Sequence, residues 1–294
     1  MSSDVASSDR GRLTTGDIVL FSLLAGTAVT FIHGYYYGLN NHIEQLPQIF
    51  RVLDPSYITN DFEVNATAGY GPRAFYVYFM AWLGKVVPLP ALFLVLTCLQ
   101  NAAVAFVTAL VARRLSGSNF AALFAASLAM SVESIHLGEA GYLRLPALIP
   151  ASLVTGLALW SIWEGIRDRP IASALIAMPA ALIHPMLGLE AGIVGVGASF
   201  LSRLIGIGGP RRWRPLLRAV AGAAILAAFG LSLWIGPQSK QLLTSRQLID
   251  IYGWFRAPHH IIPSTFPLRD YLAAAAFLIA FATSWAWWYR RPSH

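Results

Sequence analysis

Residues 89–114 read LPALFLVLTCLQNAAVAFVTALVARR, an uncharged run that ends in two arginines. An α-helix needs about 20 mostly apolar residues to cross the hydrocarbon core of a bilayer. Lys and Arg gather in the cytoplasmic loops of membrane proteins. The stretch therefore predicts a membrane-spanning helix whose C-terminal end, at Arg113 and Arg114, lies on the cytoplasmic side.

The composition of the whole chain agrees with this interpretation. Of its 294 residues, 56% are hydrophobic and only 12% are charged, with a mean hydropathy of +0.57. Soluble domains carry about 25% charged residues. The net charge of +7 is explained by basic residues in cytoplasmic loops. Since no basic stripe alternates with aromatic residues, we expect contact with membrane lipids and no nucleic-acid partner.

Further apolar runs predict further spans. They cover residues 18–37, 119–132, 146–163, 171–183, 187–205, 216–236 and 268–289. Two of these runs are short for a span, and the charge pattern decides their assignment. Basic residues cluster at Arg10/Arg12, Arg113/Arg114, Arg167/Arg169, Arg203/Arg211/Arg212/Arg214 and Arg290/Arg291. Eight spans place every cluster and both termini in the cytoplasm, which predicts a multi-pass protein of the cell inner membrane.

The predicted fold class is all-α, a polytopic membrane helix bundle of about eight transmembrane helices. One membrane domain covers residues 1–294 and begins with a cytoplasmic tail at 1–16. The first outer loop, residues 38–88, is expected to contain interfacial helices, and residues 237–267 form a second outer loop. Within the first loop, residues 72–86 are aromatic-rich, and counting them as a span would reverse the topology of everything that follows. We expect an amphipathic helix in the interface there.

Histidines and carboxylates gather on the predicted outer side. Four groups lie at helix ends or in outer loops: His42 with Glu44, Glu133 with His136, His184 with Glu190, and His259 with His260. A carboxylate beside an imidazole suits general acid–base chemistry. The same pairing suits a divalent metal, although no His-Glu-x-x-His spacing occurs, so a site without a cofactor is expected and metal binding is kept as an alternative. Each group also fits an ordinary hydrogen bond at a helix end.

The region from Asn40 to Arg114 has an order that resembles the first outer loop of the GT-C superfamily of membrane glycosyltransferases. In that family a span is followed by a catalytic acid, a juxtamembrane helix, an acidic turn, a Pro-initiated aromatic helix and a second span ending in Arg-Arg. The matching segments here are Asn41 to Glu44, Pro47 to Leu53, Asn60-Asp61-Phe62, Pro72 to Gly84, and Ala91 to Arg114. The resemblance covers about the first 145 residues in order, and the rest in topology only.

This resemblance implies a GT-C-like fold and transfer of a sugar from a polyprenyl-phosphate donor on the outer face. The implied catalytic residues are Asp61, Glu44 and His42. The implied substrate-binding residues are Arg73, Glu133, His136, His184, Glu190, Arg256, His259 and His260. In the fold that the chain resembles, the loop after the seventh span closes over the lipid phosphate, so Arg256 in that loop is expected to contact it. The sequence departs from the family at Asn41, since an amide cannot take a proton from a hydroxyl.

Two other functions remain open. Asn41 and the short chain favour a non-catalytic subunit of a polysaccharide-assembly or other membrane complex, with a membrane protein as partner. The short, Pro-interrupted run 171–183 that ends at His184 favours a small-molecule transporter. The sugar and the acceptor are not defined by the sequence.

Overall fold

The computed structural model of the chain describes residues 13–39, 41–67, 71, 73–131, 147–204, 213–235, 244–256, 258 and 262–289. Every regular element in these ranges is helical, which confirms the predicted all-α class for them. The chain divides into two compact units, residues 1–132 with 144–238 and residues 133–143 with 239–294. Each unit is described by itself.

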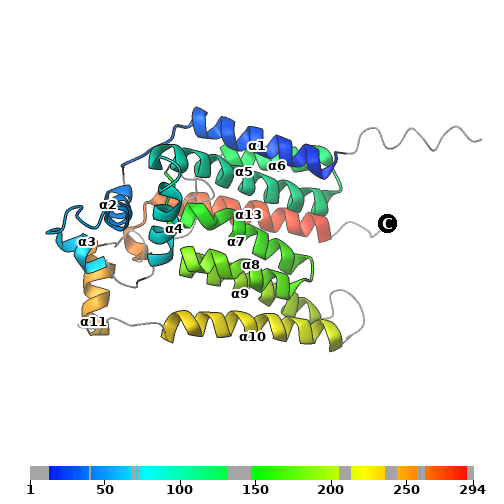
Figure 1. Cartoon of the computed structure of the whole chain (residues 1–294). Coiled ribbons are helices and arrows are strands. Elements are labelled where there is room, and N and C mark those ends of the chain that lie inside the picture. Colours follow the sequence, from blue (N-terminus) through cyan, green and yellow to red (C-terminus); the bar gives the residue numbers. More distant parts are fainter. Residues whose placement is uncertain are drawn as a thin grey trace, which may run out of the picture. The chain divides into compact units, whose positions relative to one another are not determined.

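The first unit holds the helices α1 (Thr15–Ile32), α2 (His42–Leu53), α3 (Phe62–Thr67), α4 (Ala74–Gly84), α5 (Leu89–Ser116), α6 (Asn119–Ser131), α7 (Pro150–Ile166), α8 (Pro170–Ile183), α9 (Pro185–Leu204) and α10 (Trp213–Ile235). Figure 1 shows α1 and α5 to α10 side by side, with successive helices running in opposite directions. Each predicted span of this unit coincides with one of these helices. By length and composition, three stretches of the described residues can cross a membrane: Thr15–Ile32, Leu89–Ser116 and Pro215–Leu233.

Local signals set the ends of the spans. α1 begins at Thr15 because Thr14 and Asp17 form a capping box, in which the Asp17 N–H donates to Thr14 Oγ1 over 3.2 Å. It ends at Ile32 rather than at residue 37 as predicted, since Gly34 and Gly38 have positive φ angles that break the helix. α5 ends at Ser116 because the next residue, Gly117, has a φ of +68° and forms a left-handed cap.

The helices of the first unit pack through small residues. A side chain on Gly165 of α7 would collide with the backbone of Gly195 in α9, and one on Gly188 would collide with Ala181 of α8. The Ser161 hydroxyl donates to the Ser173 carbonyl over 2.9 Å and so joins α7 to α8. Large apolar side chains such as Leu24, Phe31 and Leu231 are exposed instead. Small residues and hydroxyls at the contacts are typical of helix packing in membranes.

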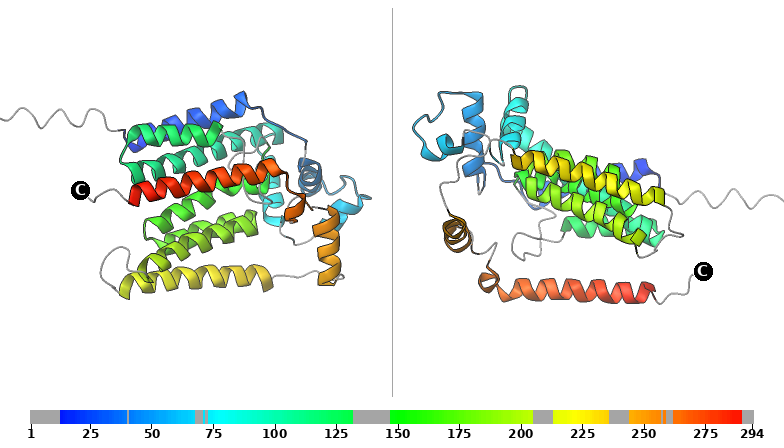
Figure 2. Two further views of the ribbon diagram at one scale, coloured as in Figure 1. Left: turned by 180° about the vertical axis from the view of Figure 1, so that it is seen from behind. Right: turned by 90° about the horizontal axis from the view of Figure 1, so that it is seen from below.

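Helices α2, α3 and α4 form what we call the platform, residues 42–84. Figure 1 and the right-hand view of Figure 2 show α2 and α4 lying across one end of the helix bundle. α4 has 11 residues and is therefore about 16 Å long, about half the thickness of the hydrocarbon core. We predicted an interfacial helix over residues 72–86, and this length fits that placement.

α4 has no charged face, unlike the amphipathic helix that we predicted, although it exposes Tyr and Trp side chains, as expected for a helix at headgroup level. Tyr76, Val77, Met80 and Ala81 are buried against α2 and the start of α5. The exposed side chains are aromatic rather than charged: Phe75, Tyr78, Phe79 and Trp82. Aromatic residues are enriched at the headgroup level of bilayers, which fits these exposed aromatic side chains.

The opposite end of the bundle is basic. Arg113 and Arg114 lie in the last turn of α5, and Arg167 and Arg169 flank the turn between α7 and α8. Because neighbouring helices alternate in direction, these residues lie at the end away from the platform, and Arg218 in the second turn of α10 joins them. We call this the basic end.

The second unit contains α11 (Ser245–Leu248), the π-helix η1 (Ile249–Arg256), the 3₁₀ turn η2 (Pro263–Thr265) and α13 (Leu268–Tyr289). α13 matches the predicted run at 268–289. Thr244 begins α11 with a capping box, since its hydroxyl accepts from the Gln247 N–H over 3.3 Å. The predicted outer loop at 237–267 is therefore helical over Ser245–Arg256.

Candidate functional site

The structure places part of the predicted site on the platform. His42 and Glu44 lie in the first turn of α2, Asp61 precedes α3, and Arg73 precedes α4. His184 and Glu190 lie at the junction of α8 and α9. Arg256 is the last residue of η1 in the second unit, and the structure describes its backbone. Four predicted residues lie outside the described residues: Glu133, His136, His259 and His260.

His42 is a buried residue with both ring nitrogens bonded to backbone groups. The Gly38 N–H donates to Nδ1 over 3.1 Å, so Nδ1 carries no proton, and Nε2–H donates to the Leu148 carbonyl over 2.8 Å. Burial lowers the pKa of His42 below its usual value, against the smaller opposing effect of the bond to Leu148. The imidazole is thus held neutral in one tautomer, and its contacts link α2 to the start of α7.

Tyr76 of α4 meets the same carbonyl. Its hydroxyl donates to the Leu148 oxygen over 3.2 Å, and its side chain is fully buried. Burial raises the pKa of Tyr76, so the hydroxyl stays protonated. The ring of Phe93 packs edge-on against His42 with 5.0 Å between centroids. We call this arrangement of His42, Tyr76 and the Leu148 carbonyl the Leu148 junction, and it fixes α2 and α4 relative to each other.

Sequence reasoning missed two members of the junction, Tyr76 and Leu148. Tyr76 was read only as one of several aromatic residues of an interfacial helix. Leu148 contributes its backbone carbonyl, and no residue type marks such a role. The signal that was available is the pair of prolines around it, Pro146 and Pro150, because prolines are common where a chain segment is extended just before a helix.

Glu44 and Arg73 form an ion pair across the two platform helices. Arg73 Nη1 donates to Glu44 Oε2 over 2.8 Å, and the side chains are 43% and 32% exposed for Arg73 and Glu44. Glu44 is two residues from His42 and Arg73 is three residues from Tyr76, so the Leu148 junction holds both backbones. The structure therefore brings together a carboxylate and a guanidinium that the sequence assigned to different roles.

Asp61 lies on the acidic tip of the platform. Its Oδ1 accepts the Val64 N–H over 2.8 Å, as an N-cap residue of α3 does, and the residue is exposed. The neighbouring carboxylate Asp54 also serves a turn, since the Ser56 hydroxyl donates to its Oδ1 over 2.6 Å. Local backbone structure thus engages one oxygen of each of these two carboxylates.

His184 and Glu190 flank the short turn from α8 to α9. His184 caps α8, and its Nδ1 accepts the Leu187 N–H over 3.2 Å, so the imidazole supports the first turn of α9. Glu190 is exposed on α9. Both residues lie towards the platform end of the bundle, because α8 ends there and α9 begins there.

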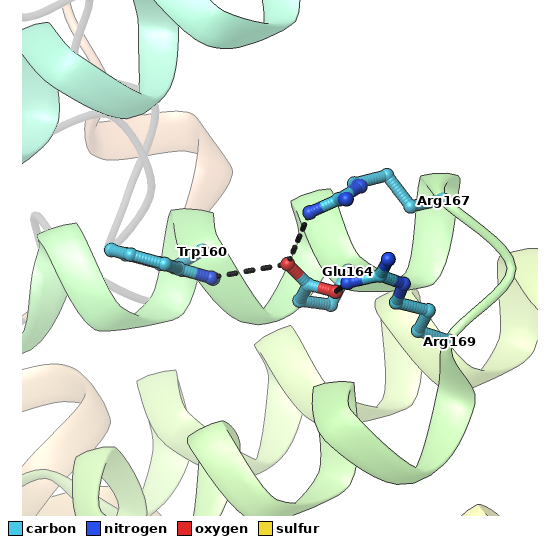
Figure 3. A network of polar contacts seen from close by, with 4 residues as sticks. All are labelled: Trp160, Glu164, Arg167 and Arg169. Atoms are coloured by element: carbon cyan, nitrogen blue, oxygen red, sulfur yellow. Dashed lines mark hydrogen bonds and ion pairs between the residues drawn. The ribbon is translucent and has the colours of Figure 1, made fainter. Parts of the chain in front are cut away.

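The basic end contains a second carboxylate–arginine group, drawn in Figure 3. Glu164 of α7 is buried, and its Oε1 accepts from Arg167 Nη1 over 3.0 Å and from Trp160 Nε1 over 3.3 Å. Arg169 Nη1 lies 3.5 Å from Glu164 Oε2. The Arg167 guanidinium also lies over the Trp163 ring, 5.7 Å from its centroid. These contacts close the turn between α7 and α8.

Among the described residues, no three His, Cys, Asp or Glu side chains lie close enough together to hold a metal ion. No protein-family model, curated protein or solved structure matches the chain. The candidate site therefore rests on the platform itself, with the Glu44–Arg73 pair at its centre.

Proposed function

We propose that the chain is a membrane glycosyltransferase of the GT-C kind that takes a sugar from a polyprenyl-phosphate donor on the non-cytoplasmic face of the cell inner membrane. The observation that carries the proposal is the Glu44–Arg73 pair, a base and a phosphate ligand held 2.8 Å apart on two fixed helices. Transfer of a sugar from a phosphate leaving group needs at least a carboxylate that accepts the hydroxyl proton and a cation that balances the phosphate charge.

The arrangement of the first unit supports the proposed sidedness. Its seven long helices alternate between a platform end and a basic end, and basic loops favour the cytoplasm. With α13 as the eighth span, both termini lie in the cytoplasm and the platform faces outward. α4 then lies in the outer interface, with its exposed aromatic side chains at headgroup level.

The proposed reaction is a single displacement with inversion at the anomeric carbon. The acceptor hydroxyl oxygen bonds to that carbon while the bond from the carbon to the phosphate oxygen breaks. The electron pair stays on the leaving polyprenyl phosphate, whose charge Arg73 balances, and the hydroxyl proton passes to Glu44. His42 keeps Glu44 in place through the Leu148 junction and is a positioning residue.

The remaining predicted residues keep secondary roles in this proposal. Asp61 is the alternative base, although one of its oxygens caps α3. His184 and Glu190 are proposed contacts of the sugar or the acceptor. Arg256, His259, His260, Glu133 and His136 belong to the second unit, and the substrate-binding roles that the resemblance implies for them stay predictions.

Donor consumption in proteoliposomes tests the proposal. The purified chain is reconstituted with a polyprenyl-phosphate sugar, and sugar release or transfer is followed over time. We expect turnover by the unaltered chain, its loss in Glu44→Gln, and its retention in Asp54→Asn, a matched removal of a platform carboxylate. Loss in Asp61→Asn with retention in Glu44→Gln would make Asp61 the base.

A second function, a non-catalytic subunit of a membrane complex, is favoured by one observation. Each platform carboxylate described above already has a partner in the chain: Arg73 for Glu44, the α3 N-terminus for Asp61, and Ser56 for Asp54. A subunit that only shares the architecture needs no carboxylate for chemistry. No donor consumption by any variant, with a stable folded chain that co-purifies with another membrane protein, would favour this function.

A further inference from the structure

The Glu44–Arg73 pair joins two groups that the proposed transfer needs apart. A guanidinium that balances a carboxylate is not available to a phosphate, and a carboxylate held by a guanidinium is a weaker base. The bond is direct, with 2.8 Å between Arg73 Nη1 and Glu44 Oε2. The pair must therefore open before Arg73 can bind a phosphate-bearing donor.

The pair contributes little to the attachment of α2 to α4. Both side chains keep about a third or more of their surface exposed, and ion pairs of this kind change a folding equilibrium by a factor of at most about five. The buried Leu148 junction and the apolar contacts of Leu46, Ile49 and Met80 hold the two helices together. Opening the ion pair therefore leaves the platform intact.

A phosphate is a stronger partner for Arg73 than one carboxylate oxygen is. The planar guanidinium can donate two parallel hydrogen bonds to a phosphate, whereas the contact with Glu44 is made by Nη1 to Oε2. Arg51, a cation on α2, is already bonded to the Tyr57 carbonyl over 2.7 Å. An anionic headgroup that enters the platform from the membrane interface thus meets Arg73 as the exchangeable cation.

We infer that Glu44 occupies the phosphate site on Arg73 until an anionic lipid donor displaces it, so that donor binding itself releases the base. This inference rests on the proposed function and adds an order to it. The phosphate takes the Arg73 guanidinium, Glu44 loses that contact and becomes a stronger base, and only then is an acceptor hydroxyl deprotonated. While the ion pair is closed, Arg73 weakens Glu44 as a base and so disfavours premature reaction with water.

Binding of polyprenyl phosphate, which carries no sugar and undergoes no turnover, tests the exchange. The full chain is placed in phosphatidylcholine nanodiscs and titrated with polyprenyl phosphate, and the uncharged polyprenol gives the background. Glu44→Gln removes the internal competitor, so we expect affinity to rise by about twofold to fivefold. Arg73→Gln removes the phosphate ligand and is expected to weaken binding by about tenfold or more.

Two controls separate competition from a general change in charge. Asp54→Asn removes a platform carboxylate that is bonded to Ser56, and its affinity is expected to match that of the unaltered chain. In the double variant Glu44→Gln with Arg73→Gln, the gain from the first substitution must vanish, because no guanidinium remains to be released. Arg73→Lys keeps the charge without the two-pronged geometry, and it replaces Arg73→Gln if that variant does not fold.

The outcomes distinguish this inference from the function on which it rests. If Glu44→Gln and the unaltered chain bind polyprenyl phosphate with equal affinity, the inference is wrong, but a polyprenyl-phosphate donor remains the proposal. A gain that persists without Arg73, or that appears equally in Asp54→Asn, overturns the inference as well. If no variant prefers polyprenyl phosphate to polyprenol, the proposed donor and the inference both fail.

Discussion

Glutamate–arginine contacts occur at both ends of the helix bundle, and the two differ in how deeply the carboxylate is buried. At the basic end the Glu164 side chain is only 6% exposed and faces two arginines, whereas Glu44 on the platform is 32% exposed and pairs with Arg73. A buried carboxylate without a counter-charge is costly. The group at Glu164 is therefore part of the fold, and the pair at Glu44 can open at little cost.

The surroundings of the two groups strengthen this contrast. Glu164 is held by neighbours in sequence, Trp160, Arg167 and Arg169, all of which belong to α7 or the turn that follows it. Glu44 meets a partner 29 residues away on another helix. The first group closes a local turn, and the second spans the surface between two platform helices.

The largest expected effect comes from leaving Glu164 buried without its arginines. The double substitution Arg167→Gln with Arg169→Gln is expected to lower the free energy of unfolding by about 3 kcal/mol, because an uncompensated charge remains in the protein interior. Thermal unfolding in detergent measures the loss. Adding Glu164→Gln should recover much of it, and a triple variant as unstable as the double one would contradict the account.

Removing His42 is expected to have the next largest effect. His42→Ala leaves the Gly38 N–H without its acceptor and removes one of the two donors to the Leu148 carbonyl, which should cost about 2 kcal/mol of unfolding free energy. Denaturation followed by tryptophan fluorescence measures it. Tyr76→Phe removes only one hydrogen bond of the same junction and is expected to cost less. Equal stability of His42→Ala and the unaltered chain would show that the junction does not hold the platform.

The pH dependence of stability gives a smaller and more specific signal. Burial lowers the pKa of His42 from 6.5, so below that pH the unfolded chain binds a proton that the folded chain resists. Stability is therefore complete above about pH 6.5 and falls as the pH drops towards the lowered pKa. His42→Gln should flatten this decline. Melting temperatures of the variant and the unaltered chain, measured between pH 5 and 8, show whether His42 causes the decline.

The smallest expected effect on stability is that of the platform ion pair. Glu44→Gln and Arg73→Gln should each change the free energy of unfolding by less than about 1 kcal/mol, since both side chains are partly exposed. The same melting assay measures this. A loss comparable to that in the Arg167/Arg169 variant would make the pair structural and would remove the contrast between the two ends.

The sequence predicted the long helices well because their signal is repeated along many residues. Each apolar run corresponds to a helix, and the charge clusters placed Arg113, Arg114, Arg167 and Arg169 at one end, as the alternation of helices in the first unit shows. Boundaries were less accurate, since α1 ends at Ile32 where two later glycines take positive φ angles. The helix at Ser245–Arg256 was read as loop because its apolar residues, from Leu248 to Phe255, form a run too short for a span and are interrupted by Asp250 and Gly253.

The site was predicted in composition but not in pairing. The sequence singled out Glu44, Arg73 and His42, yet it assigned them to separate roles, because contacts between residues 29 or 106 positions apart leave no trace in local patterns. The junction also depends on a backbone carbonyl, which every residue has. Asp61 was read as catalytic from its acidity, and its use as a helix cap follows from the α3 start that the sequence did not reveal.

The account depends most on the two ends of the bundle facing opposite sides of a membrane. In a Cys98→Ser background, single cysteines replace Ser56 on the platform and Ser116 at the basic end of α5, both of which are exposed. Right-side-out membrane vesicles are then treated with an impermeant maleimide before and after permeabilisation. We predict labelling of Ser56→Cys in sealed vesicles and labelling of Ser116→Cys only after permeabilisation; labelling of Ser116→Cys from outside, or of both sites together, would contradict the account.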